Sequence, residues 1–565
     1  MTSFICDVLK DLEINSLDIS KLRIILPNKR SGLFLKKEWA SISKRTGFLP
    51  EILSIEQFTE ELSQLRLLSN AELVFEFYSV YLDLTPLDER DSFDNFCKWA
   101  PTVLQDFNEI DRYLIPSEEI FKYLTAIQEI NHWSLDKNST PLIKGYLSFW
   151  KKVDSYYLKF TTHLLKNKFG YQGLIYRQAV EKLERYDLQN LCKSHVFIGF
   201  NALNASEARI IQHLLQLGKA SIYWDIDQIF IDTPHHDAGH FVRQYKKSWT
   251  HFKSEPFKLV SCQYSNPKNI SVVGTPKNIG QVKYVGSLLK KLHSKDKLQN
   301  TALILGNEDL LIPVLNSIPS NIKEINITMG LPLKQTPFSA FINQWFQLQR
   351  ETSSRYHCQD IIGVLSHPFV RPLLQVQNQD AGQMIITSLN KFNLSSLNKD
   401  QIIAIAPSHR AILELLFTNW NNSPSQAIKG VLELIYKLKD YYSQSKSKHL
   451  LPLEYLFRFS EIFNQLQQLN SSNNYINSIK VLQHIYKDLL SKETLDFKGK
   501  PHQGLQIMGM LESRVLDFDT VIIVSAMKME SEYKVKKDRI VKEVKVKPAQ
   551  CLKKKYQRDA AYLHS

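Results

Sequence analysis

Short apolar strands that each run into a polar loop and then a helix recur along this chain. The first covers Leu22 to Leu26, is closed by Pro27 and Asn28, and precedes a helix predicted from Gly32 to Trp39. Units of this kind are typical of α/β folds. Further strands are predicted at Val196–Ile198, Ser221–Trp224, Lys268–Gly274 and Thr301–Leu305, with a last strand-turn-strand unit in Gly504–Ala526.

Two long stretches between these units have a helical pattern instead. Apolar residues recur at three-to-four spacing from about Glu60 to Leu165 and from about Gln344 to Leu490. We therefore predict helical insertions within α/β domains. The predicted organisation is a first α/β domain (1–60 and 166–265), a helical insertion (61–165), a second α/β domain (266–345 and 490–525), a second insertion (346–489) and a basic tail (526–565).

The charge of the chain is basic but unevenly placed. Lys and Arg number 71 against 57 Asp and Glu, a net charge of +14, and half of this excess lies in Met527–Ser565. A basic balance makes nucleic acid a natural partner. The body alone, with +7 over 526 residues, would not identify a DNA-binding protein.

Membrane and secretory classes are not indicated. No apolar run approaches the ~20 residues of a membrane helix, and the N-terminus has no basic region followed by an apolar one. The six Cys include no CxxC pair, which excludes a zinc ribbon and argues against a disulfide framework. We expect a cytoplasmic protein with no membrane partner.

Motifs for ATP hydrolysis are absent from the sequence. No G-x-x-x-x-G-K-[ST] loop, whose backbone amides cradle phosphates, occurs, and Gly218-Lys219 lacks both the upstream Gly and the following Ser or Thr. There is no G-x-G-x-x-G either.

Two weaker motifs have plain structural interpretations. Asp496-Phe497-Lys498 matches the short half of a D…(D/E)-x-K nuclease site, but no acidic strand precedes it, so a solvated loop is favoured. His236 and His240 stand four apart, as metal ligands on a helix do. Gly239 interrupts this spacing and no Glu takes the general-base position, which favours a loop entering a helix.

Two charged loops follow predicted strands. Lys29 and Arg30 come after the first strand and beside a predicted helix N-terminus, a place that suits phosphate, although a solvated loop explains them equally. Glu512, Arg514, Asp517 and Asp519 precede the last strand. They fit either a buried ion network or a ligand-facing loop, and composition does not separate the two.

Several segments, in this order, resemble a known family. The alternation of α/β and helical blocks is similar to superfamily 1 helicases, and the detailed match is to AddB-like proteins of the PD-(D/E)XK nuclease superfamily, subunits of AddAB/RecBCD-type helicase-nucleases. The matching segments are ILPNKRSGLFLKKEW, LPEILSIEQF, FCKWAPTVLQDFNEID, VFIGFNALNASEARII, IYWDID, GHFVRQY, GQVKYVGSLL, ITMGLPLKQTP, LSHPFV and LQIMGMLESRVLDFDTVII.

The resemblance implies two RecA-like P-loop-fold domains with helical insertions, the second of them incomplete. It implies that Lys29 and Arg30 face DNA, and that Gln281 opens the helix after the first strand of the second domain. Gln281 and Arg514 are then further DNA-binding candidates. LESRVLDFD matches the segment that couples nucleotide to DNA in active relatives, with Glu512, Asp517 and Asp519 as its motif residues.

The departures from the family pattern bear on activity. Gly199-Phe200 stands where an active nucleotide site has an Asp-Glu pair, so we expect a degenerate ATP site. We expect no catalytic residue, metal or cofactor in this chain, with Mg²⁺ and ATP belonging to the full-length family complex. The C-terminal nuclease domain of relatives is expected to be missing, and an out-of-frame origin is our hypothesis for the residues after Ala526; a genuine basic tail is the alternative.

The expected function is that of a DNA-binding, helicase-like subunit in double-strand break repair and recombination. Its partners would be single-stranded or forked DNA and an AddA-like helicase-nuclease subunit. One alternative is an active ATP-dependent helicase or exonuclease. Another is a non-functional truncated scaffold fragment.

Overall fold

The computed structural model shows an α/β protein. It describes residues 3–15, 21–42, 48–122, 141–189, 194–258, 260–294, 298, 300–349, 355–376, 379–444, 450–495 and 504–525. The chain divides into two compact units. Unit 1 is Met1–Leu67, Asp106–Met329 and Phe497–Ser565, and unit 2 is Leu68–Gln105 and Gly330–Asp496. Within the described ranges, no helix combines the length and the apolar character that crossing a membrane requires.

The first sheet of unit 1 has four parallel strands in the order β2-β1-β5-β6. The strands are β1 (Leu22–Leu26), β2 (Glu51–Ser54), β5 (Ser194–Ile198) and β6 (Ala220–Tyr223). All five residues of β1 are buried, as in a sheet covered on both faces. Helices α1 (Phe4–Asn15) and α2 (Lys29–Ile42) cover one face, and α3 (Ile55–Ser63), α8 (Gln172–Glu181), α10 (Ala205–Gln216) and α12 (His240–Ser248) cover the other.

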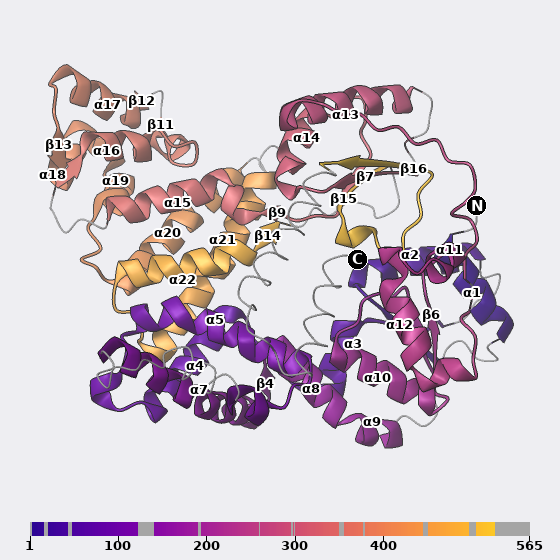
Figure 1. Cartoon of the computed structure of the whole chain (residues 1–565). Helices are drawn as coiled ribbons and strands as arrows, with labels where there is room; N and C mark the ends of the chain where they lie inside the picture. Colours follow the sequence, from indigo (N-terminus) through magenta and orange to yellow (C-terminus); the bar gives the residue numbers. More distant parts are fainter. Residues whose placement is uncertain are drawn as a thin grey trace. The chain divides into compact units, whose positions relative to one another are not determined.

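The second sheet of unit 1 is also parallel and has the order β16-β7-β15-β8. Its strands are β7 (Thr301–Leu305), β8 (Ile325–Ile327), β15 (Leu505–Gly509) and β16 (Thr520–Val524). Helices α13 (Lys277–His293) and α14 (Leu311–Ser317) pack on one face. The outer strand β16, which is yellow in Figure 1, leaves Val521 and Ile523 about half exposed. The strand-turn-strand prediction is confirmed, but β7 lies between its two strands.

The predicted strand Lys268–Gly274 is wrong. These residues have no regular secondary structure, and their side chains are exposed, with Ile270 at 77% and Val272 at 94%. The alternating apolar pattern favours an extended chain. A strand, however, also needs a neighbour for its backbone N–H and C=O groups, and no strand among the described residues pairs with this segment.

Unit 1 holds further elements away from the two sheets. They are β3 (Arg66–Leu67), β4 (Phe169–Gly170), α7 (Pro141–Lys166), α9 (Leu183–Gln189), α11 (Gln228–Asp232) and the C-terminal part of α5 (Phe93–Arg112). The fully buried Asp111 of α5 connects this helix to α7, which contains Tyr157, and to α8, which contains Arg177. Its carboxylate accepts hydrogen bonds from Tyr157 (2.5 Å), Tyr171 and the Arg177 guanidinium (2.6 Å).

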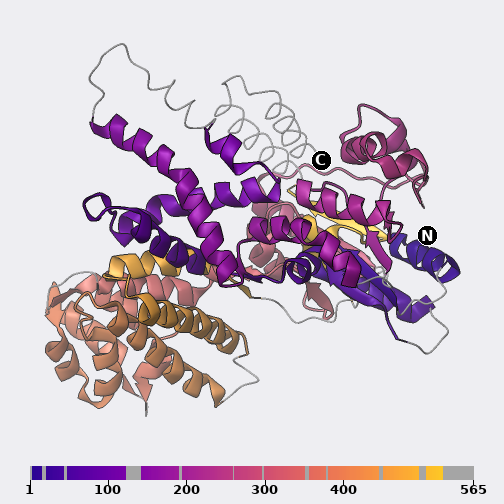
Figure 2. The same ribbon diagram turned by 90° about the horizontal axis from the view of Figure 1, so that it is seen from below.

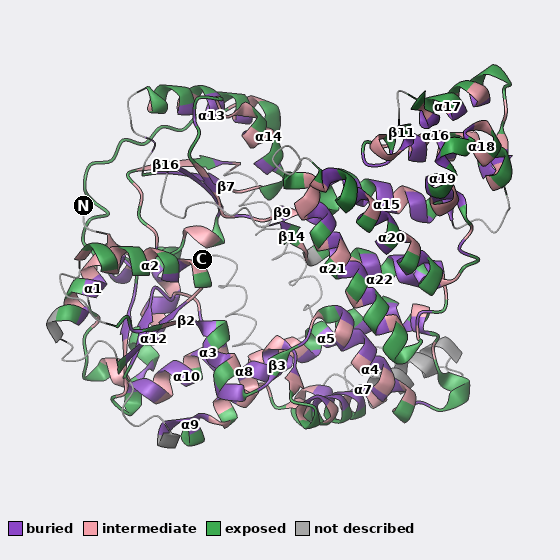
Figure 3. Ribbon diagram, turned by 180° about the vertical axis from the view of Figure 1, so that it is seen from behind, coloured by how far each residue is buried: buried purple, intermediate pink, exposed green. Residues whose placement is uncertain are grey.

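Unit 2 is mainly helical, and its buried residues lie on the helix faces that turn toward one another (Figure 3). Its helices are α4 (Asn70–Leu84), the N-terminal part of α5, α15 (Pro337–Leu348), α16 (Cys358–Leu365), α17 (Ala381–Lys391), α18 (Lys399–Ile405), α19 (Arg410–Phe417), α20 (Pro424–Ser443), α21 (Leu450–Asn473) and α22 (Ile479–Lys492). Helices α20 and α21 pack side by side (Figure 2). The predicted insertion 61–165 is thus shared between the two units.

Short strand pairs accompany the helices of unit 2. They are β10 (Arg355–His357) with β13 (Ser396–Asn398), β11 (Gln375–Val376) with β12 (Gln379–Asp380), and β9 (Leu331–Pro332) with β14 (Thr494–Leu495). The predicted stretch Gln344–Leu490 is therefore mostly helical, as expected. The two pairs that lie inside it were not predicted.

Candidate functional site

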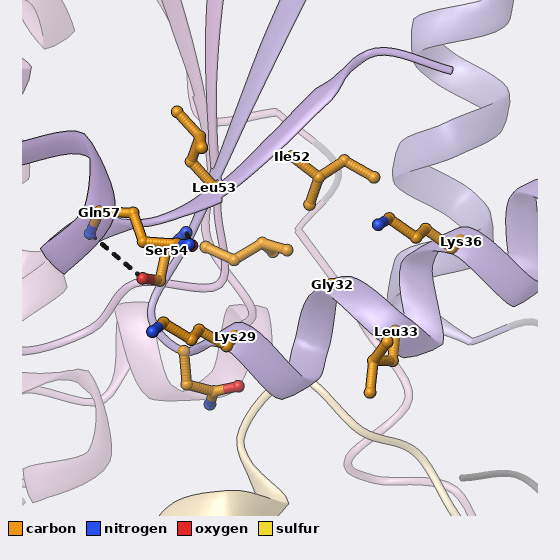
Figure 4. Close-up of a pocket in the computed structure, with 10 residues that line it drawn as sticks. Lys29, Gly32, Leu33, Lys36, Ile52, Leu53, Ser54 and Gln57 are labelled. Carbon is orange, nitrogen blue, oxygen red and sulfur yellow. Dashed lines mark hydrogen bonds between the residues drawn. The ribbon is translucent and has the colours of Figure 1, made fainter. Parts of the chain in front are cut away.

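A pocket of about 190 Å³ lies at the carboxyl ends of β1 and β2 (Figure 4). The two strands are parallel and in register, with Leu26 beside Ser54, so both chains leave the sheet at the same edge. β1 is followed within three residues by α2, and β2 is followed directly by α3. Carboxyl ends of parallel strands are where α/β sheets bind ligands.

Two helix N-termini border this pocket. The Asn28 side chain, just before α2, accepts hydrogen bonds from the Ser31 backbone N–H (2.8 Å) and from the Ser31 hydroxyl (3.0 Å). Ser54 caps α3: its hydroxyl accepts from the Gln57 N–H (3.3 Å), while the Gln57 side chain accepts from the Ser54 N–H (3.0 Å). Helix N-termini carry a partial positive charge and favour anions.

Two lysines of α2 add full positive charges. Lys29 and Lys36 are seven residues apart, so they lie on one helix face, and both line the pocket (Figure 4). The amino group of Lys29 extends toward Ser54, and that of Lys36 extends toward Ile52. Both side chains are exposed, and neither forms an ion pair with a described residue. Their charges therefore remain available to an anion.

Close packing of α2 on β2 shapes the pocket floor. A Cβ atom on Gly32 would lie 3.1 Å from the Ile52 side chain, tighter than ordinary contact. Gly32, which has no side chain, thus lets α2 lie close to β2. As a result, Lys29 and Lys36, before and after Gly32 in the sequence, reach the end of the strand. Leu33 leaves 47% of its side chain exposed beside them.

The lining chemistry suits one phosphate group rather than a nucleotide. Pockets that enclose drug-sized ligands measure about 300–1,000 Å³, well above the 190 Å³ here. The described residues that line the pocket include two lysines, two amides and a hydroxyl but no carboxylate. They do not fit Mg²⁺·ATP well, because Mg²⁺ sites usually include one or two carboxylates and the described lining has none.

The structure separates Lys29 from Arg30. Arg30 lies on another face of α2, with its guanidinium 5.6 Å from the Phe34 ring centre. Its Nε is buried and has no hydrogen-bond partner among the described residues. Burial lowers the pKa of Arg30 to about 10, and the negative charge of Glu512 opposes this shift. Arg30 therefore belongs to a different environment from the pocket.

Glu512 lies beside a second carboxylate at the ends of β15 and β7. A Cβ atom on Gly509 would be 2.4 Å from one Glu512 oxygen and 3.4 Å from one Glu308 oxygen. Burial raises the pKa of Glu308, and the charges of Glu512 and Asp309 add to this effect. Arg30 on α2 and Glu512 in this loop interact electrostatically, so the loop belongs to a group of neighbouring charged side chains.

The other predicted residues are spread over three places. Helix α13 begins at Lys277, so Gln281 is its fifth residue and does not open it. The Gln281 side chain accepts hydrogen bonds from the Ser525 N–H (3.0 Å) and hydroxyl (3.3 Å). Asp517 accepts a hydrogen bond from the Phe4 N–H (2.8 Å). Arg514 and Asp519 are exposed, and the Asp519 N–H donates to the Asn300 carbonyl (3.1 Å). Of the seven predicted residues, only Lys29 lines the pocket.

The two weaker motifs add no site within the described residues. His236 accepts a hydrogen bond from the Ala238 N–H (3.3 Å) and lies 4.5 Å from the Phe230 ring, while His240 begins α12. No cluster of three potential metal ligands occurs in the described ranges. Asp496–Lys498 and the tail from Ala526 lie outside the described residues.

Sequence reasoning missed Lys36, Ser54 and Gln57. Two signals were present: the seven-residue spacing of Lys29 and Lys36 on a predicted helix, and the capping pattern Ser54-x-x-Gln57 before an apolar residue. Neither says that α2 and α3 begin side by side. That proximity comes from the pairing of β1 with β2.

No protein-family model matches the chain, and no curated sequence matches it.

Proposed function

We propose that this chain is a DNA-binding, helicase-like subunit of an AddAB/RecBCD-type helicase-nuclease complex. It would act in double-strand break repair and recombination beside an AddA-like catalytic partner in the cytoplasm. In this proposal the two sheets of unit 1 are RecA-like domains and the helical segments are their insertions. The proposal combines the family resemblance with the chemistry of the α2/α3 pocket.

The pocket is the observation that carries the DNA-binding part. It offers Lys29, Lys36 and two capped helix N-termini to an anion, and its volume suits one phosphate. Phosphate contacts of this kind supply most of the affinity of nucleic-acid binding without reading sequence. The exposed Leu33 beside the lysines provides an apolar surface for a sugar or a base.

The absence of carboxylates in the pocket supports a subunit without its own ATP hydrolysis. The sequence lacks a phosphate-binding loop, and the pocket residues do not fit Mg²⁺·ATP. We therefore expect DNA binding that does not change when ATP is added.

Salt-dependent DNA binding tests this function. Fluorescence anisotropy with a labelled single-stranded oligonucleotide would measure the affinity of the full chain between low and moderate salt. Each phosphate contact to a single strand contributes about 0.7 to the slope of log affinity against log salt. Lys29→Gln with Lys36→Gln removes both cations from the single phosphate contact of the pocket, so it is expected to weaken binding and to lower this slope by about 0.7.

A matched control separates the pocket from general charge. Lys290→Gln with Lys291→Gln removes the same charge from exposed positions on α13 of the same unit. The control should bind almost as wild type does. Equal losses in the two double variants, or no binding by wild type at low salt, would contradict the proposal.

A further inference from the structure

Val515 occupies a strained position in the loop between β15 and β16. Its φ is +67°, in the left-handed region that β-branched residues rarely adopt. The side chain is nevertheless 3% exposed. A strained residue of this type persists only where the surrounding structure holds it in place. The side chains that pack against Val515 provide this support.

The core that receives Val515 belongs to the first sheet. Val515 packs among buried side chains of β1, β5 and β6, which include Leu26 and Ile198, and of helices α1 and α2. Its neighbour Leu516 is partly buried against the same cluster. A loop that connects two strands of the second sheet thus contributes a core residue to the first.

Gly199 provides the space for this contact. It follows β5 directly and has a φ of +71°. A Cβ atom at this position would lie 2.2 Å from Val515 Cγ2, a distance that no real pair of carbons adopts. Gly199 therefore serves both its own backbone conformation and the close approach of Val515.

Two polar interactions lie on either side of Val515 in the loop, one from a residue before it and one from a residue after it. On one side Glu512 interacts electrostatically with Arg30 at the start of α2. On the other side Asp517 accepts a hydrogen bond from the Phe4 N–H at the start of α1, 513 residues away in sequence. The loop therefore contacts the first sheet and both helices on that face.

We propose that Met510–Asp519 is a latch that holds the two sheets of unit 1 in one arrangement. The sheets separate into a more open arrangement when Val515 leaves the core of the first sheet. The latch works through side-chain packing and needs no bound nucleotide. It does not rest on the DNA-binding function proposed above.

A distance measurement between the sheets tests the latch. Spin labels at Lys37→Cys on α2 and Lys290→Cys on α13, in a chain whose native Cys are replaced, would report the separation by electron paramagnetic resonance. The parent chain is expected to show one narrow distance population. Gly199→Ala, which expels Val515, is expected to add a second population at longer distance.

Control variants separate release of the latch from loss of stability. Leu35→Ala removes a side chain from the same core but leaves the loop intact, so it should keep the single population. If Gly199→Ala does not fold, Val515→Ala should give the second population to a smaller extent. A single, unchanged population in every folded variant at Gly199 or Val515 would overturn the proposal, as would a second population in Leu35→Ala.

Discussion

Arg23 and Glu51 form a two-point ion pair between neighbouring strands at the edge of the first sheet. The Nε and one Nη of Arg23 each lie 2.7 Å from a carboxylate oxygen of Glu51. Glu61 accepts a further hydrogen bond from Nη2 (2.7 Å), and the Tyr186 hydroxyl accepts one from Nη1 (2.7 Å). Arg23 is 2% exposed, whereas both carboxylates are 43% exposed, so the cation is buried and its anions remain partly in water.

This asymmetry decides which substitution harms stability. Glu51→Ala with Glu61→Ala leaves a buried, uncompensated cation, and we expect it to lower the free energy of unfolding by about 2–3 kcal/mol, near the lower end for broken buried pairs. Adding Arg23→Met should recover most of this loss, because the charge is then gone. Urea denaturation of the three chains measures both effects, and no recovery in the triple variant would contradict the explanation.

Ser54 allows helix capping to be separated from anion binding. Ser54→Ala removes the cap of α3 and should cost about 1 kcal/mol of stability. Ser54→Asp keeps a capping oxygen but places a negative charge in the pocket, so it should retain stability and lose DNA affinity. If the pocket binds phosphate, Ser54→Asp should be the more stable variant in thermal unfolding, and Ser54→Ala should bind DNA more tightly in the anisotropy measurement. Tight DNA binding by Ser54→Asp would exclude the pocket as the contact.

Asp111 is expected to be the most sensitive polar residue of unit 1. It is fully buried, and its carboxylate forms an ion pair with the Arg177 guanidinium at 2.6 Å. Asp111→Asn keeps the shape but removes this charge, with an expected loss of about 3 kcal/mol. Tyr157→Phe removes one hydrogen bond and should cost about 1–2 kcal/mol. Denaturant midpoints of the two variants would refute this if their order were reversed.

The Asp225 carboxyl gives unit 1 a defined pH dependence. The residue is exposed, but the groups packed around its carboxyl and the charge of Asp517 raise the pKa of Asp225 to about 6. An ordinary Asp titrates near 3.9. Because the folded-state pKa is the higher one, this group stabilises the fold below about pH 4 and loses that contribution as the pH rises to about 6.

The corresponding variant is Asp225→Asn. It should melt at a higher temperature than wild type at pH 7.5, and the advantage should shrink as the pH falls toward 4. Other carboxyls titrate in both chains, so the difference between the two melting curves isolates Asp225. A difference that does not change with pH would show that the raised pKa plays no part in stability.

Local pattern was enough to predict most strands of the two four-stranded sheets. Leu22–Leu26 and Thr301–Leu305 were predicted with the bounds that the structure has, because a short apolar run between a charged or polar residue and a turn has few other uses. The Lys268–Gly274 prediction failed because the presence of a partner strand is not a local property. The same limit explains why β7 was not expected between β15 and β16.

The candidate site was predictable only in part. Lys29 was found from its position after β1, but the adjacent Arg30 was grouped with it since sequence proximity does not show that successive helical residues point about 100° apart. Lys36 and Ser54 join Lys29 through strand pairing. Val515 carried no signal at all, because its positive φ and its contact with Gly199 depend on the whole of unit 1.

The strand order of the second sheet has a consequence for synthesis of the protein. Both neighbours of β7, which ends at Leu305, come from residues that begin at Leu505, 200 positions later. At about 5–20 residues per second, a ribosome needs about 10–40 s to supply them. During that time the apolar strand β7 has no native partner. The nascent chain should therefore depend on chaperones, and heat shock or chaperone depletion should reduce its soluble yield.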